Sequence, residues 1–173
     1  FRGNFWQADQ ITSGPTAELE TWPEVVAVIP ARNEASSIGR TVSSLLAQDY
    51  PGTLSVIVVD DNSDDGTADI ARAAAGTNAD KLSIISGMPL AEGWSGKLWA
   101  VNQGIEGSQS SAGSSKYILL TDADITHTPG NLSWLVGKAE TSALDLISEM
   151  VMLRCQSFWE KLLIPAFVFF FQK

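Results

Sequence analysis

The chain has 173 residues, of which 45% are hydrophobic, and this size and composition fit one globular domain with a substantial core. Its 11 basic and 20 acidic residues give a formal net charge of -9, which argues against nucleic acid as a partner and leaves no polybasic patch for a membrane. Acidic sites instead suit bound cations. A single cysteine, Cys155, cannot form an internal disulfide, so we expect a reducing, cytoplasmic compartment.

Strand and helix patterns alternate along the chain. Apolar segments rich in β-branched residues predict strands over residues 24–30, 54–60, 81–86, 117–122 and 144–153. Helical stripes between them are formed by Ile38, Val42, Leu45 and Leu46, by Leu98, Val101 and Ile105, and by Leu132, Leu135 and Val136. This order predicts an α/β fold with a mostly parallel sheet and helices on both faces. The Ser/Gly-rich residues 106–116 are expected to form an exposed loop.

The two ends of the chain differ from its middle. We expect an N-terminal extension over residues 1–23, the α/β domain over 24–156, and an apolar helix over 157–173. The ten apolar residues 162–171 are fewer than the roughly twenty that span a bilayer, so a core helix, an interfacial helix and an interrupted spanning segment all fit. Four phenylalanines near the end favour membrane contact in a longer parent protein.

Polar clusters follow the first four predicted strands, with the sequences PARNEASS, DDNSDDGT, GMPLAEGWSGK and TDADITHT. In a parallel sheet, ligands bind in the crevice at the carboxyl ends of the strands. We therefore expect these four clusters to converge in space.

The second cluster begins with Asp60 and Asp61 at the end of a strand, and Ser63 or Asp65 is placed to cap the next helix. A calcium loop counted from Asp61 would need a glutamate at its twelfth position, where Arg72 stands, so that hypothesis fails. Two interpretations stay open: a well-capped turn, or acids that accept hydrogen bonds from a base or ribose.

Phosphate binding needs another device, because no GxGxxG follows the first strand and the sequence contains no GxxxxGK[ST]. A divalent cation binds phosphates with only one or two protein carboxylates. Asp122 and Asp124 project to the same side of an extended segment while Ala123 turns away. They can form such a site, or they can be two solvated acids.

The segments VIPARNE, VVDDNSDDGT, GWSGKLWAVNQG and YILLTDAD, in this order and spacing, resemble the nucleotide-binding half of the family 2 glycosyltransferases, whose fold is called GT-A. The resemblance covers about residues 24–140, and its strength lies in four motifs at four successive strand ends. More narrowly, GWSGKLWA, the start FRGNFW and the end RCQSFWEKLLIPAFVFFFQK look like the hopene-associated glycosyltransferases, which are membrane-bound relatives in hopanoid-making bacteria.

The resemblance implies a role for each matching residue. The loop that borders the nucleotide comprises Pro30, Ala31, Asn33 and Glu34. Asp60 and Asp61 match the acids that hold the base and ribose, and Gly96, Lys97 and Asn102 match the following motif. The metal pair, Asp122 and Asp124, would bind Mg²⁺ or Mn²⁺ with the diphosphate, and Asp122 would also touch the ribose. Lys97 suits a site for a diphosphate leaving group, because its ammonium offsets the negative charge that grows on the diphosphate. The alternative interpretation is that Lys97 is an exposed lysine at the start of a helix.

The implied function is transfer of a sugar, with inversion, from a nucleotide-sugar donor, most often UDP-linked, to a hydroxyl acceptor. A lipid acceptor and the cytoplasmic face of a bacterial inner membrane follow from the subfamily resemblance and the apolar end. An inverting enzyme needs a general base, and no acid after Asp124 has the family's context, so we expect the base to lie outside this chain.

Several alternatives remain. The chain can be an inactive fragment that binds nucleotide and metal, or a haloacid-dehalogenase-like phosphatase with Asp122 as nucleophile, although that class needs a later lysine and an acidic pair after Lys138. His127 can be a metal ligand, but a surface group is the commoner case. Trp94 and Trp99 can line the donor site, or Trp99 can belong to the core.

Overall fold

In the computed structural model, the described residues are 18–111, 115–153 and 155–171, and their strands form one parallel sheet. The strand order is β3-β2-β1-β4, with bounds β1 Val25–Ala31, β2 Leu54–Asp60, β3 Leu82–Ser86 and β4 Tyr117–Leu120. The helices are α1 Ile38–Leu46, α2 Thr67–Ala75, α3 Gly96–Ser111, α4 Asn131–Ser142 and α5 Phe158–Phe171, with a 3₁₀ helix η1 at Gly76–Lys81. The predicted parallel α/β fold is confirmed.

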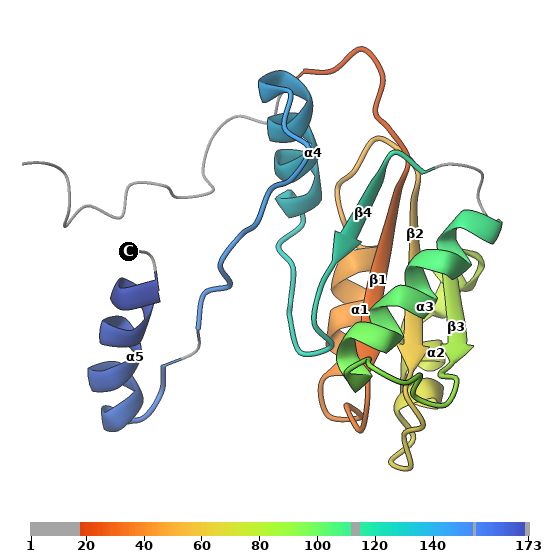
Figure 1. The fold of residues 1–173 in the computed structure, drawn as a ribbon. Helices are drawn as coiled ribbons and strands as arrows, with labels where there is room; N and C mark the ends of the chain where they lie inside the picture. The colour runs from red at the N-terminus through yellow and green to blue at the C-terminus, as the bar shows by residue number, and fades with distance from the viewer. Residues whose placement is uncertain (1–17, 112–114, 154, 172–173) are drawn as a thin grey trace, which may run out of the picture.

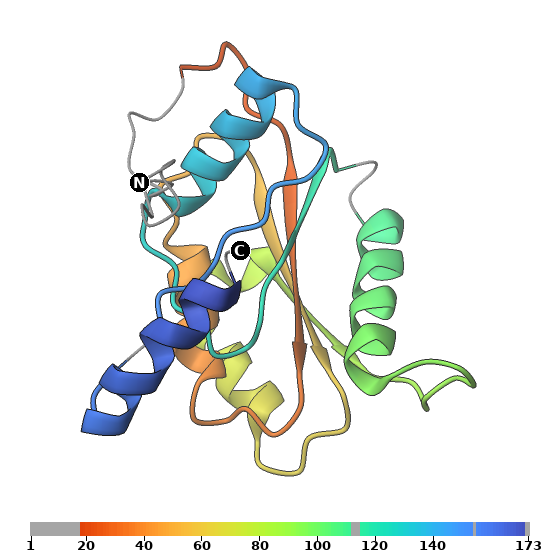
Figure 2. The same ribbon diagram turned by 60° about the vertical axis from the view of Figure 1, so that its left-hand side comes forward.

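Helices cover both faces of the sheet, as Figure 2 shows with α3 on one side and α1 and α2 on the other. Side chains alternate between faces along a strand, so Ala27 and Ile29 pack in the cluster beneath α1 and α2, whereas Val26 and Val28 pack with Ala100 of α3. A third cluster joins Val25 to α4. Because both faces are buried, β1 and residues 56–59 of β2 are continuous apolar runs.

The buried face of α3 is not the predicted stripe of leucine, valine and isoleucine. Leu98 is 60% exposed, whereas Ala100 is 1% exposed and Gly104 is buried against the sheet. A Cβ on Gly104 would collide with Val28 Cγ1 and lie 3.0 Å from Val59 Cγ2. Small residues on this face let the helix approach β1 and β2 closely. Helix α3 continues through Ser111, so the loop predicted over 106–116 is wrong for residues 106–111.

Residues 144–153, which were predicted as a fifth strand, form none in the described chain. They follow α4 as an irregular segment in which Leu146 is 84% exposed and Met152 is 94% exposed. A strand pattern needs a neighbouring backbone to pair with, and this segment is not hydrogen-bonded to β4 as a strand. The alternation is present in the sequence, but the pairing is not present in the structure.

The two ends of the described chain lie outside the sheet. Of the predicted N-terminal extension, residues 1–17 are not described, while Leu19 and Trp22 pack against the cluster beside α4. The predicted C-terminal helix is present as α5, which stands apart from the sheet in Figure 1 and contains Pro165. Among the described residues, no helix combines the length and apolar character needed to cross a bilayer. The three-part division of the chain stays a prediction.

Candidate functional site

Strand register brings the predicted polar clusters to one edge of the sheet. Ala31 pairs with Asp60, and Asp60 pairs with Ser86, so β1, β2 and β3 end side by side. The N–H of Thr121 donates to the carbonyl of Val28 at 3.3 Å, which continues the end of β4 along β1. The four clusters therefore converge, as the sequence predicted, around an open cleft of about 370 Å³.

Most of the predicted site residues line this cleft. They are Pro30, Ala31, Glu34, Asp61, Gly96, Lys97, Asp122 and Asp124. Three further residues line it without having been predicted, namely Arg32, Ala100 and Ala123. Arg32 is a basic residue next to the predicted loop residues and across from an acidic loop, and this charge contrast was a signal that the sequence offered.

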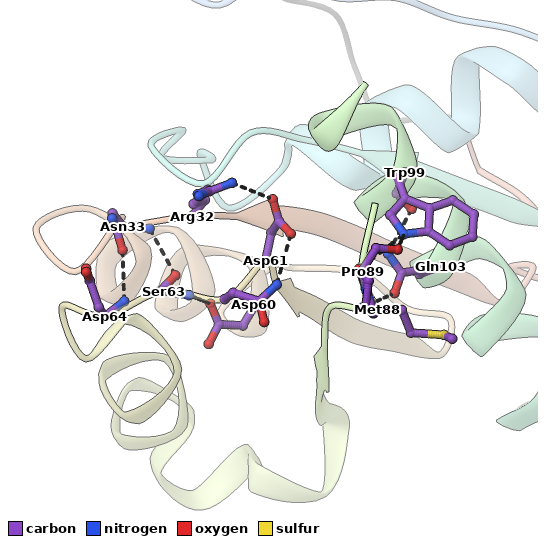
Figure 3. Close-up of polar contacts among 11 residues, drawn as sticks. Arg32, Asn33, Asp60, Asp61, Ser63, Asp64, Met88, Pro89, Trp99 and Gln103 are labelled. Carbon is purple, nitrogen blue, oxygen red and sulfur yellow. Dashed lines mark hydrogen bonds and ion pairs between the residues drawn. The ribbon is translucent and has the colours of Figure 1, made fainter. Parts of the chain in front are cut away.

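Asp61 lies at the wall of the cleft, opposite Arg32. Its N–H donates to the carbonyl of Ala31 at 2.8 Å, and its Oδ2 lies 3.4 Å from Nη1 of Arg32 (Figure 3). The side chain of Asp61 is 19% exposed, while that of Arg32 is 69% exposed. Gly87 fits close behind, because a Cβ there would lie 3.1 Å from Asp61 Cα and 3.3 Å from its Oδ1. One carboxylate is thus held at the cleft with an exposed cation beside it.

Asp60 and Asn33 hold the loops together and do not line the cleft. Asp60 Oδ1 accepts a hydrogen bond from the N–H of Ser63 at 3.1 Å. Asn33, with φ of 56°, accepts from the N–H of Asp64 at 3.0 Å and donates its own N–H to Ser63 Oγ at 2.9 Å (Figure 3). The loops after β1 and β2 are therefore tied to each other. Of the predicted acid pair, only Asp61 faces the cleft.

Asn102, the third residue predicted from the motif that begins α3, lies away from the cleft lining. Its Nδ2 donates to Glu106 Oε1 at 2.9 Å along the same helix. The motif residues Gly96 and Lys97 lie one to two turns earlier, at the N-terminal end of α3 where it meets the strand ends. The N-terminal end of α3, through Gly96, Lys97 and Ala100, contributes to the cleft.

The paired acids of the fourth cluster flank a buried alanine. Ala123 is 4% exposed, and its carbonyl accepts a hydrogen bond from Thr41 Oγ1 of α1 at 2.7 Å. Asp122 and Asp124 line the cleft, and Lys97 Nζ lies 2.7 Å from Asp122 Oδ1 with both side chains more than half exposed. Both acids reach the cleft as expected, but Ala123 lines it too and residues 123–124 form a turn, so the expected extended alternation with Ala123 turned away is wrong.

The donor set fits a divalent cation that shares its coordination with a ligand. No group of three or more His, Cys, Asp or Glu side chains gathers in a metal-binding arrangement among the described residues. Mg²⁺ typically takes one or two carboxylates and completes its shell with water and substrate phosphates. Asp122 and Asp124 supply those carboxylates on the open side of the cleft.

His127 and the two tryptophans have structural partners. The Nε2 of His127 lies 3.0 Å from Thr121 Oγ1 and its Nδ1 lies 3.2 Å from Asn131 Oδ1, so both ring nitrogens are occupied and metal ligation is not supported. The indole N–H of Trp99 donates to the carbonyls of Met88 and Pro89 at 3.2 and 3.1 Å, as Figure 3 shows. Trp94 packs on Trp99 with ring centroids 5.4 Å apart. The tryptophans hold the loop after β3 and do not line the cleft.

A parallel sheet with an acidic cleft at its carboxyl edge defines an α/β protein of the nucleotide-binding type. The family described as Glycosyl transferase family 2 matches residues 26–164, and the chain belongs to this family. The GT-A fold expected from the sequence is thereby confirmed.

Known relatives agree with this assignment. A 4,4'-diaponeurosporenoate glycosyltransferase of Staphylococcus aureus is 35% identical over 99 residues, which cover 57% of this chain and 23% of that protein. A mannosyltransferase from Pyrobaculum calidifontis, solved with GDP-Man and Mn²⁺, superposes with a TM-score of 0.57 at 26% identity over 78% of this chain and 38% of that one. The structure of S. aureus TarS 1-349 with UDP-GlcNAc, 19% identical with a TM-score of 0.56, shares the fold over 76% of this chain and 37% of its own. The chain spans only about a quarter of the curated relative's length.

Proposed function

We propose that this chain forms the donor-binding half of an inverting glycosyltransferase, which transfers a sugar from a nucleoside-diphosphate sugar to a hydroxyl acceptor. The observation that carries the proposal is the convergence of Asp61, Lys97, Asp122 and Asp124 on one cleft at the carboxyl edge of the sheet. Membership of the family supports it, as does the GDP-Man and Mn²⁺ bound by the P. calidifontis relative.

Each cleft residue has a chemical task in this proposal. Asp61 accepts hydrogen bonds from the base or ribose of the donor, and Arg32 beside it is free to turn toward an anionic group. Asp122 and Asp124 hold Mg²⁺ or Mn²⁺, which supplies Lewis-acid stabilisation of the leaving diphosphate when bound. Lys97 places an ammonium group at the same point, where it offsets the negative charge that grows on the diphosphate.

The donor and acceptor are proposed at a finer level. We expect a UDP-linked donor, following the family resemblance, and an apolar, lipid-like acceptor. The S. aureus relative, named for 4,4'-diaponeurosporenoate, supports the apolar character of the acceptor, although that name specifies a carboxylate and not a hydroxyl group. The exposed apolar side chains of α5 support contact with a membrane. The cytoplasmic face of a bacterial inner membrane is proposed from the subfamily resemblance alone. The hopene-associated subfamily stays a prediction from the motifs in the sequence.

The general base is expected outside this chain. Among the described residues after Asp124, the four acids Glu140, Asp145, Glu149 and Glu160 do not line the cleft. Glu140 accepts from Lys116, and this contact together with the Tyr117 hydroxyl holds the pKa of the Glu140 carboxyl below its ordinary value. A carboxylate with a lowered pKa is a weak base, and Glu140 lies outside the cleft lining. We propose that the base comes from the acceptor-binding half of a longer protein.

Calorimetric titration with UDP and GDP, with and without Mn²⁺, tests the donor site. We expect nucleotide binding that strengthens with Mn²⁺, and we expect the double variant D122N/D124N to lose the Mn²⁺ effect while it still binds uridine. Hydrolysis of a phosphate ester without nucleotide affinity would overturn the proposal in favour of a phosphatase. Binding without transfer to any acceptor is the result expected of the donor half alone.

A further inference from the structure

The loop that contains Asp122 and Asp124 is closed by the side chain of His127. This loop runs from the end of β4 at Leu120 to the start of α4 at Asn131. His127 is half-buried and bridges the two ends of the loop, through Thr121 Oγ1 at 3.0 Å and Asn131 Oδ1 at 3.2 Å. Both acids therefore lie inside a ring of residues that the imidazole closes.

The polar partners determine the direction of each hydrogen bond. Asn131 Nδ2 donates to Glu149 Oε2 at 2.6 Å, so the amide oxygen of Asn131 faces His127. That oxygen can only accept, which makes Nδ1 of the imidazole the donor. The other nitrogen, Nε2, lies 3.0 Å from the hydroxyl oxygen of Thr121. Hydrogen bonds thus connect Thr121 through His127 and Asn131 to Glu149.

The backbone of the loop is tied to α1 independently of the imidazole. The N–H of His127 donates to Ser44 Oγ at 3.1 Å, and the carbonyl of Ala123 accepts from the buried Thr41 hydroxyl at 2.7 Å. Thr121 directly precedes Asp122, and Ala123 stands between the two acids. The backbone of Thr121 is also held to β1, because its N–H donates to the Val28 carbonyl at 3.3 Å. With α1 holding the middle of the loop, the imidazole adds the side-chain contact to Thr121, directly before Asp122.

We propose that His127 is a positioning residue for the metal-binding acids: it holds Thr121, and through Thr121 it sets the placement of Asp122 relative to Asp124. This inference rests on the proposed function, since it names the residue that shapes the proposed metal site. A ligand pair that is already in place loses less freedom when a cation binds, so the benefit should appear as metal affinity.

The test uses three variants of the intact chain. H127F keeps a planar ring without a donor or acceptor, and H127Q offers one amide that can accept from Thr121 and donate to Asn131. The matched control is Y117F, which removes a 2.6 Å hydrogen bond from β4 to Glu140 of α4, joining the same two elements without touching the loop. The readouts are the Mn²⁺ concentration that half-saturates UDP binding, the affinity for uridine, and the thermal midpoint.

We expect H127F to raise the half-saturating Mn²⁺ concentration about tenfold, H127Q to restore most of the loss, and uridine affinity to stay unchanged. Y117F should lower the thermal midpoint without a Mn²⁺ effect. If H127F and Y117F shift the Mn²⁺ requirement equally, His127 has only a structural role and the inference is overturned.

A second measurement separates this inference from the proposed function. If the parent chain binds neither UDP nor Mn²⁺, the proposed function fails. Hydrogen exchange still measures how firmly His127 holds the loop. H127F should speed exchange of the amides of residues 121–126 in the metal-free chain, and Y117F should not. Unchanged protection in H127F would overturn the positioning role whatever the chain binds.

Discussion

At the scale of single residues, the cleft places a cation beside an acid at two points. Arg32 lies 3.4 Å from Asp61, and Lys97 lies 2.7 Å from Asp122. Arg32, Lys97 and Asp122 are each more than half exposed, and ion pairs in such surroundings contribute only about 0.2–1 kcal/mol to stability. These charges therefore matter more for a bound anion and cation than for folding.

Lys97 offers the sharpest residue-scale prediction. We expect K97Q to weaken UDP binding in the presence of Mn²⁺ about tenfold, since one charge-assisted contact to a diphosphate is lost, and to leave uridine affinity unchanged. Calorimetry measures both affinities. The matched control is K116Q, which breaks another 2.7 Å lysine–carboxylate pair outside the cleft lining. Equal losses for UDP and uridine would show that Lys97 does not face the diphosphate.

At the scale of elements, α3 depends on a glycine to reach the sheet. We expect G104A to lower the free energy of unfolding by about 1–3 kcal/mol, because its Cβ collides with Val28 in a fully packed layer. Urea denaturation measures the change. G130A is the control for a Cβ that meets open space, and because Gly130 is the N-cap of α4, where alanine caps poorly, we expect a loss of no more than about 1 kcal/mol. A stable G104A variant would mean that α3 can shift away from β1 without cost.

The loops after β1 and β2 are joined by Asp65 at the start of α2. Its Oδ1 accepts from the Thr67 hydroxyl at 2.5 Å and the Thr67 N–H at 3.0 Å, and its Oδ2 accepts from the N–H of Ala35 at 2.9 Å. These bonds, the Thr67 hydroxyl first, hold the pKa of Asp65 below its ordinary value of 3.8. The N-cap residue of α2 is Gly66, so the prediction that Ser63 or Asp65 caps this helix is wrong; Asp65 instead accepts the N–H of Thr67, the first residue of the helix.

This lowered pKa predicts a pH dependence. The unfolded chain takes up the proton first, so the stabilisation is present above pH 3.8 and is lost as the pH falls through that value toward the lower pKa of the folded state. We expect D65N to have a lower urea midpoint than the parent at pH 7, and the gap to narrow near pH 3. A gap of constant size across this range would show that the charge of Asp65 contributes nothing.

At the scale of the whole molecule, exposed apolar side chains gather near the C-terminal end of the described chain. Phe158, Trp159, Leu162, Leu163 and Phe167 of α5 are each between 54% and 71% exposed. Apolar side chains that enter a bilayer stabilise the contact in proportion to the apolar area that they bury. A net charge of -9 disfavours anionic lipid, so the proposed contact should depend on apolar burial.

Sedimentation with neutral phosphatidylcholine vesicles tests this contact. We expect the chain to bind, and L162S/L163S to weaken binding at least tenfold, because each leucine contributes about 1.5–3 kcal/mol when buried. The control L90S/L98S changes two leucines that are 58% and 60% exposed elsewhere in the chain. If both double variants bind equally, α5 is not the membrane-contacting element.

Much of this protein follows from local patterns in the sequence. β1 and residues 56–59 of β2 are apolar runs because both sheet faces are covered, and this made the parallel sheet predictable. The carboxyl ends of parallel strands lie at one edge of the sheet. The convergence of Asp61, Lys97, Asp122 and Asp124 was therefore predictable from the sequence.

Other features depend on which surfaces meet, and the linear pattern does not contain that information. Apolar periodicity predicted that Leu98 lies on the buried face of α3. In the structure Ala100 and Gly104 occupy that face, because only small residues fit where the helix approaches Val28. The alternation in residues 144–153 predicted a strand, yet a strand requires a neighbouring backbone to pair with. His127 was an isolated polar residue in the sequence, and only the tertiary structure brought Thr121 and Asn131 to its two nitrogens. Sequence thus determined the fold class and the charged groups of the cleft, whereas long-range packing decided which side chains face the cleft and which hold it in shape.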